Sequence, residues 1–139
     1  MADLVLIDTC IWAPFFSKKK SPHQSAVADL LDQDRAAIIG PILAEVLLGF
    51  TKDAEADWVA SALIGVQYLE LPRKDWRAAA KLGRNLAASG HFLPLSDLAL
   101  AVAAQRHQSS LYSIDPHFDV VPNLKRFFPE AITKKTRKK

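Results

Sequence analysis

Four acidic residues in this chain of 139 residues stand where a carboxylate could serve chemistry. Asp8 and Asp115 each follow a short apolar run that is typical of a buried strand. Asp97 falls in the first turn of an expected helix, where the partial positive charge of the helix terminus favours the ionised form. Glu45 stands within an apolar helical segment, where a charge without a partner would be costly. Because parallel strands end at one edge of their sheet, we expect these side chains to gather there.

Each carboxylate also has a purely structural explanation. Asp8 can form a strand-end turn, Asp97 can match the helix dipole, and Asp115 can cap the turn that follows it. Glu45 can be an exposed point on an amphipathic helix. Gathered together, however, carboxylates would repel by roughly 4 kcal/mol per close pair at an effective dielectric near 20, and a divalent cation removes that penalty. Mg²⁺ and Mn²⁺ prefer such oxygen ligands. Either ion can activate a water for displacement at phosphorus, so the pattern predicts phosphodiester hydrolysis, although a phosphatase could use the same geometry.

The elements that must position these residues alternate between strands and helices. Leu4–Ile7 is apolar on both faces, which is typical of a central strand in a parallel sheet covered by helices. This alternation predicts an α/β layered domain with a mostly parallel sheet. Further strands are expected at 36–39, 66–71, 111–114 and 124–128, and helices at 11–16, 22–31, 42–48, 53–63, 72–88 and from Ser96 onward.

Length and composition predict one domain over residues 1–130 and a basic, disordered tail over 131–139. The net charge of +3 arises in the tail, since five of the 18 basic residues lie among the last six positions and the rest of the chain has 13 basic against 15 acidic residues. The single cysteine excludes a disulfide within the chain and a cysteine-rich zinc site. No apolar run approaches the roughly 20 residues that span a bilayer, and no secretory signal is recognisable, so we expect a cytoplasmic protein without membrane contact.

The segments around the four carboxylates resemble the acidic motifs of the PIN-domain ribonucleases, and most of all those of the VapC toxins of bacterial toxin–antitoxin pairs. The resemblance runs from about Leu4 to Phe128. The segments are Leu-Ile-Asp8-Thr9, Ala-Glu45-Val-Leu-Leu-Gly49, Leu95-Ser96-Asp97-Leu98-Ala99-Leu100-Ala101 and Ser113-Ile114-Asp115-Pro116-His117-Phe118.

This resemblance implies a three-layer α/β/α sandwich and an endoribonuclease that depends on Mg²⁺ or Mn²⁺. It also implies a homodimer and neutralisation by a cognate VapB-like antitoxin. By position in the motifs, the catalytic and metal-binding residues are Asp8, Glu45, Asp97 and Asp115, with Thr9 and Ser113 as hydroxyl neighbours that orient a carboxylate or a water.

Two positions depart from the family pattern. Cys10 stands where such proteins commonly have serine or asparagine, and a thiol is a poorer hydrogen-bond partner. His117 stands where members often place another acid, two residues after Asp115. Asp119 can substitute for that acid, or the site holds fewer ligands. His117 could shuttle a proton, but a metal-dependent mechanism does not require it, so we leave it out of the catalytic set.

Basic and aromatic side chains could bind RNA or a partner. Arg73 and Arg77 lie at helical spacing, and the run Lys18, Lys19 and Lys20 follows the Asp8 segment closely. Both groups could contact RNA phosphates, although charged helix faces are more often simply solvated. Trp12 and its neighbours Phe15 and Phe16 could stack on bases, accept an antitoxin helix or lie in the core.

Two other functions remain open at this point. The first is a PIN-like module that binds RNA or a partner without catalysis, and it would bind equally well after loss of Asp8 or Asp97. The second is a small phosphohydrolase of the haloacid dehalogenase type, which also places an aspartate after its first strand. That chemistry normally needs a second aspartate at the position of Cys10, and the five scattered glycines form no phosphate-binding loop.

Overall fold

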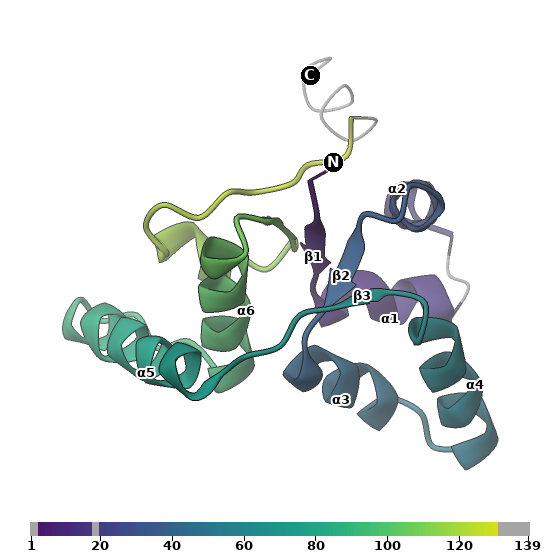
Figure 1. The fold of residues 1–139 in the computed structure, drawn as a ribbon, viewed down its shortest axis with the longest axis horizontal. Helices are drawn as coiled ribbons and strands as arrows, with labels where there is room; N and C mark the ends of the chain where they lie inside the picture. The colour runs from purple at the N-terminus through teal and green to yellow at the C-terminus, as the bar shows by residue number, and fades with distance from the viewer. Residues whose placement is uncertain (1–2, 18–19, 131–139) are drawn as a thin grey trace.

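The computed structural model describes residues 3–17 and 20–130, and its centre is a four-stranded sheet (Figure 1). Its strands stand in the order β3-β2-β1-β4, and every strand pair is parallel. Val5 lies opposite Ala36 on one side and Ser110 on the other, so β1 is the central strand that the apolar run predicts. The strands are β1 (Val5–Ile7), β2 (Ala36–Ile38), β3 (Gln67–Tyr68) and β4 (Ser110–Tyr112).

Helices cover both faces of the sheet, which confirms the three-layer α/β/α architecture (Figure 1). The chain passes from β1 to β2 to β3 in one direction and then returns beyond β1 to β4. Because parallel crossovers are right-handed, the helices of the return connection lie on the opposite face from the others. On one face are α1 (Thr9–Phe16), α2 (Pro22–Asp32), α3 (Gly40–Leu48) and α4 (Asp53–Leu63), and on the other are α5 (Arg73–Ala88) and α6 (Leu95–Arg106).

The core is centred on β1 and on helix α6. All three residues of β1 are fully buried, and so is Trp12 in α1, which places this aromatic residue in the core rather than on a binding surface. In α6 every residue from Asp97 to Ala104 is buried, because the helix lies between the sheet and α5. Asp97 is thus carried by one of the most deeply buried helices of the chain.

Helix α5 holds α6 in place through one close approach and one ion pair. A Cβ atom added to Gly83 would lie 2.8 Å from the Leu98 side chain, so the glycine lets the two helices pack closely. Arg106 at the end of α6 pairs with the buried Asp75 of α5, with 3.0 Å between Nε and Oδ2. The sequence gives no signal for this pair, because neither residue lies in a recognisable motif.

Two expected strands differ from the structure. The segment 66–71 forms only the two-residue edge strand β3, and both of its residues are exposed. The segment 124–128 forms no strand, since its contact with β4 is a single bridge between Leu111 and Arg126. Leu111 exchanges backbone hydrogen bonds with Lys125 and Phe127. Pro122 and Pro129 lie on either side of this short segment and have no N–H group with which to extend the ladder.

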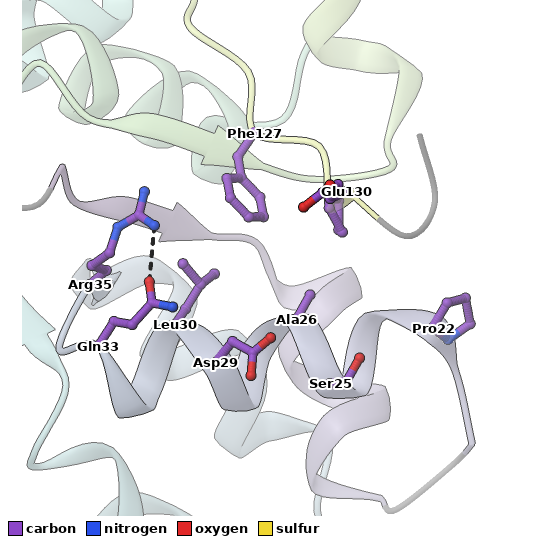
Figure 2. Close-up of a pocket in the computed structure, with 10 residues that line it drawn as sticks. Pro22, Ser25, Ala26, Asp29, Leu30, Gln33, Arg35, Phe127 and Glu130 are labelled. Carbon is purple, nitrogen blue, oxygen red and sulfur yellow. Dashed lines mark hydrogen bonds between the residues drawn. The ribbon is translucent and has the colours of Figure 1, made fainter. Parts of the chain in front are cut away.

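The C-terminal segment then runs over α2 and leaves a pocket there (Figure 2). Phe127 and Glu130 face the helix across this pocket, which lies apart from the acidic residues of interest. Within 3–17 and 20–130, no helix is both long and apolar enough to cross a membrane. The expected tail over 131–139 lies outside the described residues, so the division at residue 130 stays a prediction.

Candidate active site

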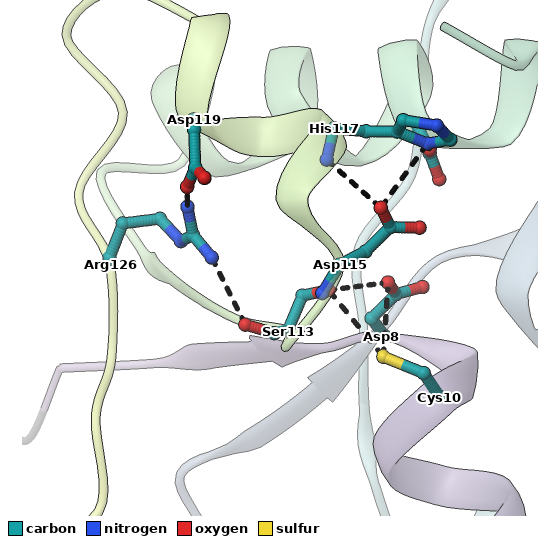
Figure 3. Close-up of polar contacts among 8 residues, drawn as sticks. Asp8, Cys10, Ser113, Asp115, His117, Asp119 and Arg126 are labelled. Carbon is teal, nitrogen blue, oxygen red and sulfur yellow. Dashed lines mark hydrogen bonds and ion pairs between the residues drawn. The ribbon is translucent and has the colours of Figure 1, made fainter.

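Asp8 is fixed at the point where the central strand becomes a helix. Its backbone N–H donates to the Tyr112 carbonyl at 3.0 Å, which continues the pairing of β1 with β4. Its side chain caps α1, because Oδ1 accepts the Thr9 N–H at 2.7 Å. The Ser113 hydroxyl donates to Oδ2 at 2.7 Å, and the Cys10 sulfur lies 3.6 Å from the same oxygen (Figure 3). The carboxylate is therefore buried but held by three donors.

A second group, formed by Asp97, Asp115 and His117, lies beside Asp8. Asp115 caps the short 3₁₀ helix η1 (Pro116–Val120), since its Oδ1 accepts the His117 N–H at 2.9 Å. That turn brings His117 Nδ1 to 2.8 Å from Asp97 Oδ2 and 3.3 Å from Asp115 Oδ1. Figure 3 shows Asp115 and His117 above Asp8, with the Ser113 hydroxyl between strand and loop. Two elements that are both far from β1 in sequence, α6 and η1, thus meet at the end of this strand.

Glu45 joins the site through Thr9. The Thr9 hydroxyl donates to Glu45 Oε1 at 2.7 Å, which links α3 to the start of α1. Its side chain is exposed, so the charge of Glu45 does not carry the cost that a buried position in this apolar segment would impose. Ile42 and Val46 carry the buried side of α3, and Glu45 lies on the side open to solvent.

Burial and mutual repulsion disfavour ionisation of Asp8 and Asp97. Burial is the main reason that the pKa of Asp8 is raised, and the hydrogen bonds from Ser113 and Thr9 oppose it. Burial also raises the pKa of Asp97, with further contributions from the charges of Asp8 and Asp115. The hydrogen bond with Asp97 raises the pKa of His117. The site therefore concentrates negative charge that favours a cation.

The donor set fits a divalent metal ion. The nearest ligand atoms of Asp97, Asp115 and His117 all lie within 4.8 Å of one another. Asp8 lies close enough to Asp97 for the two charges to interact. Carboxylate oxygens are ligands that both Mg²⁺ and Mn²⁺ prefer, and a first-row transition ion such as Mn²⁺ also accepts an imidazole nitrogen.

The structure leaves several expected site residues apart from this cluster. Asp119 turns toward Arg126, with 3.2 Å between Oδ1 and Nη1, and its side chain is 69% exposed. Arg73 and Arg77 are exposed on α5, and Lys20 is exposed before α2. Lys18 and Lys19 lie outside the described residues.

Arg126 is a site neighbour that the sequence reasoning missed. Its Nη2 donates to the Ser113 carbonyl at 3.0 Å, so it holds the loop between Ser113 and Asp115 against the C-terminal segment. A pocket of about 390 Å³ lies there, bordered by Asp115, Arg126 and Phe128. No periodic pattern surrounds Arg126 in the sequence, and only its three-dimensional neighbours reveal this role.

Comparisons with known proteins give the family and the fold to which this chain is similar. The family model of the PIN domain matches residues 5–124. VapC ribonuclease Mb1587 of Mycobacterium bovis is 29% identical over 125 residues, covering 87% of this chain and 93% of that protein. Ribonuclease VapC11 of Mycobacterium tuberculosis has the same identity and coverage.

Two solved structures show the same fold. VapBC2 from Rickettsia felis, bound to a DNA fragment from its promoter, superposes with a TM-score of 0.76 at 20% identity, covering 89% of this chain and 97% of that one. DNA-bound VapBC from Salmonella typhimurium gives a TM-score of 0.74 at 17% identity, with 91% and 98% covered.

Proposed function

This chain belongs to the PIN domain family, and on that premise we propose that it is a metal-dependent endoribonuclease, the toxin of a toxin–antitoxin pair. The observation that carries the proposal is the meeting of Asp8, Asp97 and Asp115 at the carboxyl end of the central parallel strands. Relatives named as VapC ribonucleases support RNA as the substrate. Membership of this family leaves the haloacid dehalogenase alternative without support.

In this mechanism Asp8, Asp97 and Asp115 would hold a divalent ion, and Glu45 of α3, which is linked to the site through Thr9, would complete the acidic set. The bound ion would lower the pKa of a water and stabilise the charge that develops on the phosphate. Ser113 and Thr9 keep the carboxylates of Asp8 and Glu45 oriented through their 2.7 Å hydrogen bonds. Such preorganisation means that the ligands need not be ordered when the ion binds.

Exposed basic residues supply the surface for the RNA backbone. Arg73 and Arg77 lie on α5 together with Lys74, Lys81 and Arg84. All of these residues except Arg73 border one pocket on the helix. Phosphate contacts of this kind provide affinity without sequence preference. The pocket bordered by Asp115, Arg126 and Phe128 is the nearest hollow in which a nucleotide beside the scissile phosphate could lie.

We further propose that a VapB-like antitoxin neutralises the protein and that two copies of the protein form a homodimer. We place the protein in the cytoplasm. The similarity to VapBC structures supports the antitoxin partner. An exposed aromatic side chain, Trp58, lies against Phe16 on the face formed by α1 and α4 and offers an apolar contact for a partner helix.

The experiment is cleavage of a mixed structured-RNA pool by the purified full chain, freed of any partner, with Mg²⁺, with Mn²⁺ and with EDTA. Asp97→Asn removes one charge of the site, and Asp57→Asn removes the same charge from an exposed position on α4 as a matched control. We expect cleavage that needs the metal, disappears in Asp97→Asn and persists in Asp57→Asn.

Other outcomes separate the alternatives. RNA binding without cleavage by the wild type, unchanged in Asp97→Asn, would support a non-catalytic binding module. Cleavage that persists in a folded Asp97→Asn protein would refute the assignment of Asp97. Circular dichroism of each variant confirms that loss of activity does not reflect unfolding.

A further inference from the structure

The position of the His117 imidazole suits a ligand of a metal ion. Its Nδ1 faces two carboxylates at once, with 2.8 Å to Asp97 Oδ2 and 3.3 Å to Asp115 Oδ1. In an octahedral site with ligand distances near 2.1 Å, adjacent ligand atoms lie about 3 Å apart. The two measured separations lie on either side of that value. His117 Nδ1 is therefore spaced from one carboxylate oxygen of α6 and from one of the β4–η1 loop as a neighbouring ligand of one small ion would be.

The local backbone fixes this position without the ion. Asp115 caps η1 through the His117 N–H at 2.9 Å, and Pro116 restricts the chain between the two residues. The same turn therefore sets both the carboxylate and the imidazole. The His117 side chain is 45% exposed, so a bound ion could keep water on its remaining positions.

We propose that His117 is a metal ligand, together with Asp97 and Asp115, and that its nitrogen makes this a site for Mn²⁺ in preference to Mg²⁺. The inference rests on the proposed metal-dependent function and deepens it. Mg²⁺ takes oxygen ligands almost exclusively, whereas first-row transition ions bind imidazole well. One nitrogen among carboxylates thus changes which ion the site selects.

A different role for His117 would be that of a counter-ion, which balances the carboxylates and moves aside when a metal binds. The two roles differ in one observable property. A ligand places its nitrogen directly on the metal, and a counter-ion does not. Electron spin echo spectroscopy of bound Mn²⁺ detects such a nitrogen through its magnetic coupling to the metal, independently of RNA cleavage.

The test uses the metal-free full chain titrated with Mn²⁺, with Mg²⁺ as competitor, in three variants. His117→Asp replaces the nitrogen by oxygen, and His117→Ala removes the ligand. His91→Gln, at an exposed position after α5, is the matched control. We expect nitrogen coupling in the wild type and in His91→Gln, and none in either His117 variant.

The competition gives the second readout. We expect the preference for Mn²⁺ over Mg²⁺ to fall at least about tenfold in His117→Asp, and Mn²⁺ affinity to fall by a similar factor in His117→Ala. Mn²⁺ binding without nitrogen coupling, or coupling that persists in His117→Asp, would overturn this inference while leaving the ribonuclease proposal standing. Failure of the wild type to bind either ion would overturn both.

Discussion

Replacing Asp97 by asparagine should stabilise the metal-free protein while abolishing its response to metal. The asparagine has nearly the same shape and can still accept a hydrogen bond from His117, but it carries no charge. Asp97 is only 7% exposed, and its pKa is raised mainly by burial and further by the charges of Asp8 and Asp115. The wild type therefore folds against an electrostatic cost that the variant avoids.

The size of the effect follows from the geometry of the cluster. The ligand atoms of Asp97 and Asp115 lie within 4.8 Å, and two full charges at that separation repel by about 3.5 kcal/mol at an effective dielectric near 20. The Asp115 side chain is 32% exposed, and the His117 imidazole lies between the two carboxylates, so most of this repulsion is screened. We expect a net gain of about 1 kcal/mol, which corresponds to a rise in Tm of about 3 °C.

The gain should depend on pH in a defined direction. Below the ordinary pKa of 3.8, Asp97 is protonated in both the folded and the unfolded wild type, so it does not lower the free energy of unfolding. The cost appears as the pH rises through the raised pKa of the folded state. His117 adds to the trend, because its raised pKa stabilises the wild type below 6.5 and this contribution is lost as the pH rises. The gain should therefore be larger at pH 8 than at pH 5.

Differential scanning calorimetry at both pH values, with EDTA and then with Mn²⁺, measures the gain in stability, its dependence on pH and the response to metal. We expect Mn²⁺ to raise the Tm of the wild type far more than that of Asp97→Asn, since ligand binding stabilises only a protein that binds it. A metal-free variant that is less stable than the wild type at pH 8, or a gain that does not change with pH, would refute the electrostatic reasoning.

Three further changes test other contacts. Ser113→Ala removes the hydroxyl that orients Asp8, and RNA cleavage rates should fall about tenfold while circular dichroism stays unchanged. Arg106→Leu leaves Asp75 buried without its ion-pair partner, so urea denaturation should show a loss of about 2 kcal/mol in the free energy of unfolding. Leu6→Ala opens a cavity in the central strand and should cost about 3 kcal/mol in the same assay, and a loss below 1 kcal/mol would contradict its packing.

The parts of the fold that follow from the sequence are those with strong apolar patterning. The Leu4–Ile7 run predicts a central strand because both of its faces are apolar, and β1 is fully buried. The helix expected at 53–63 has these bounds in the structure, where acidic residues occupy its first turn. The segment 124–128 also contains large apolar residues, Leu124, Phe127 and Phe128, but it pairs at one residue only. Apolar content predicts burial, whereas a ladder also needs several aligned partners.

The candidate site likewise has features that the sequence predicts and features that it does not. The placement of Asp8 and Asp115 follows from their positions after parallel strands, because the topology brings such ends to one edge. The contact between His117 and Asp97 depends on the turn of η1 and on the packing of α6, neither of which a local pattern specifies. The exposure of Glu45 likewise depends on how α3 is rotated against its neighbours.

No linker separates the last residue of β1 from the cap of α1, since Asp8 itself joins them. Displacing this carboxylate would require opening the central strand, so its neighbours should exchange their amide hydrogens only when the whole domain unfolds. His117 lies on one short turn near the surface, where opening needs far less free energy. The two sides of the site thus belong to regions of very different local stability. In the proposed ribonuclease, adjustment to a different ion or RNA would therefore fall to the turn, while the strand keeps its position.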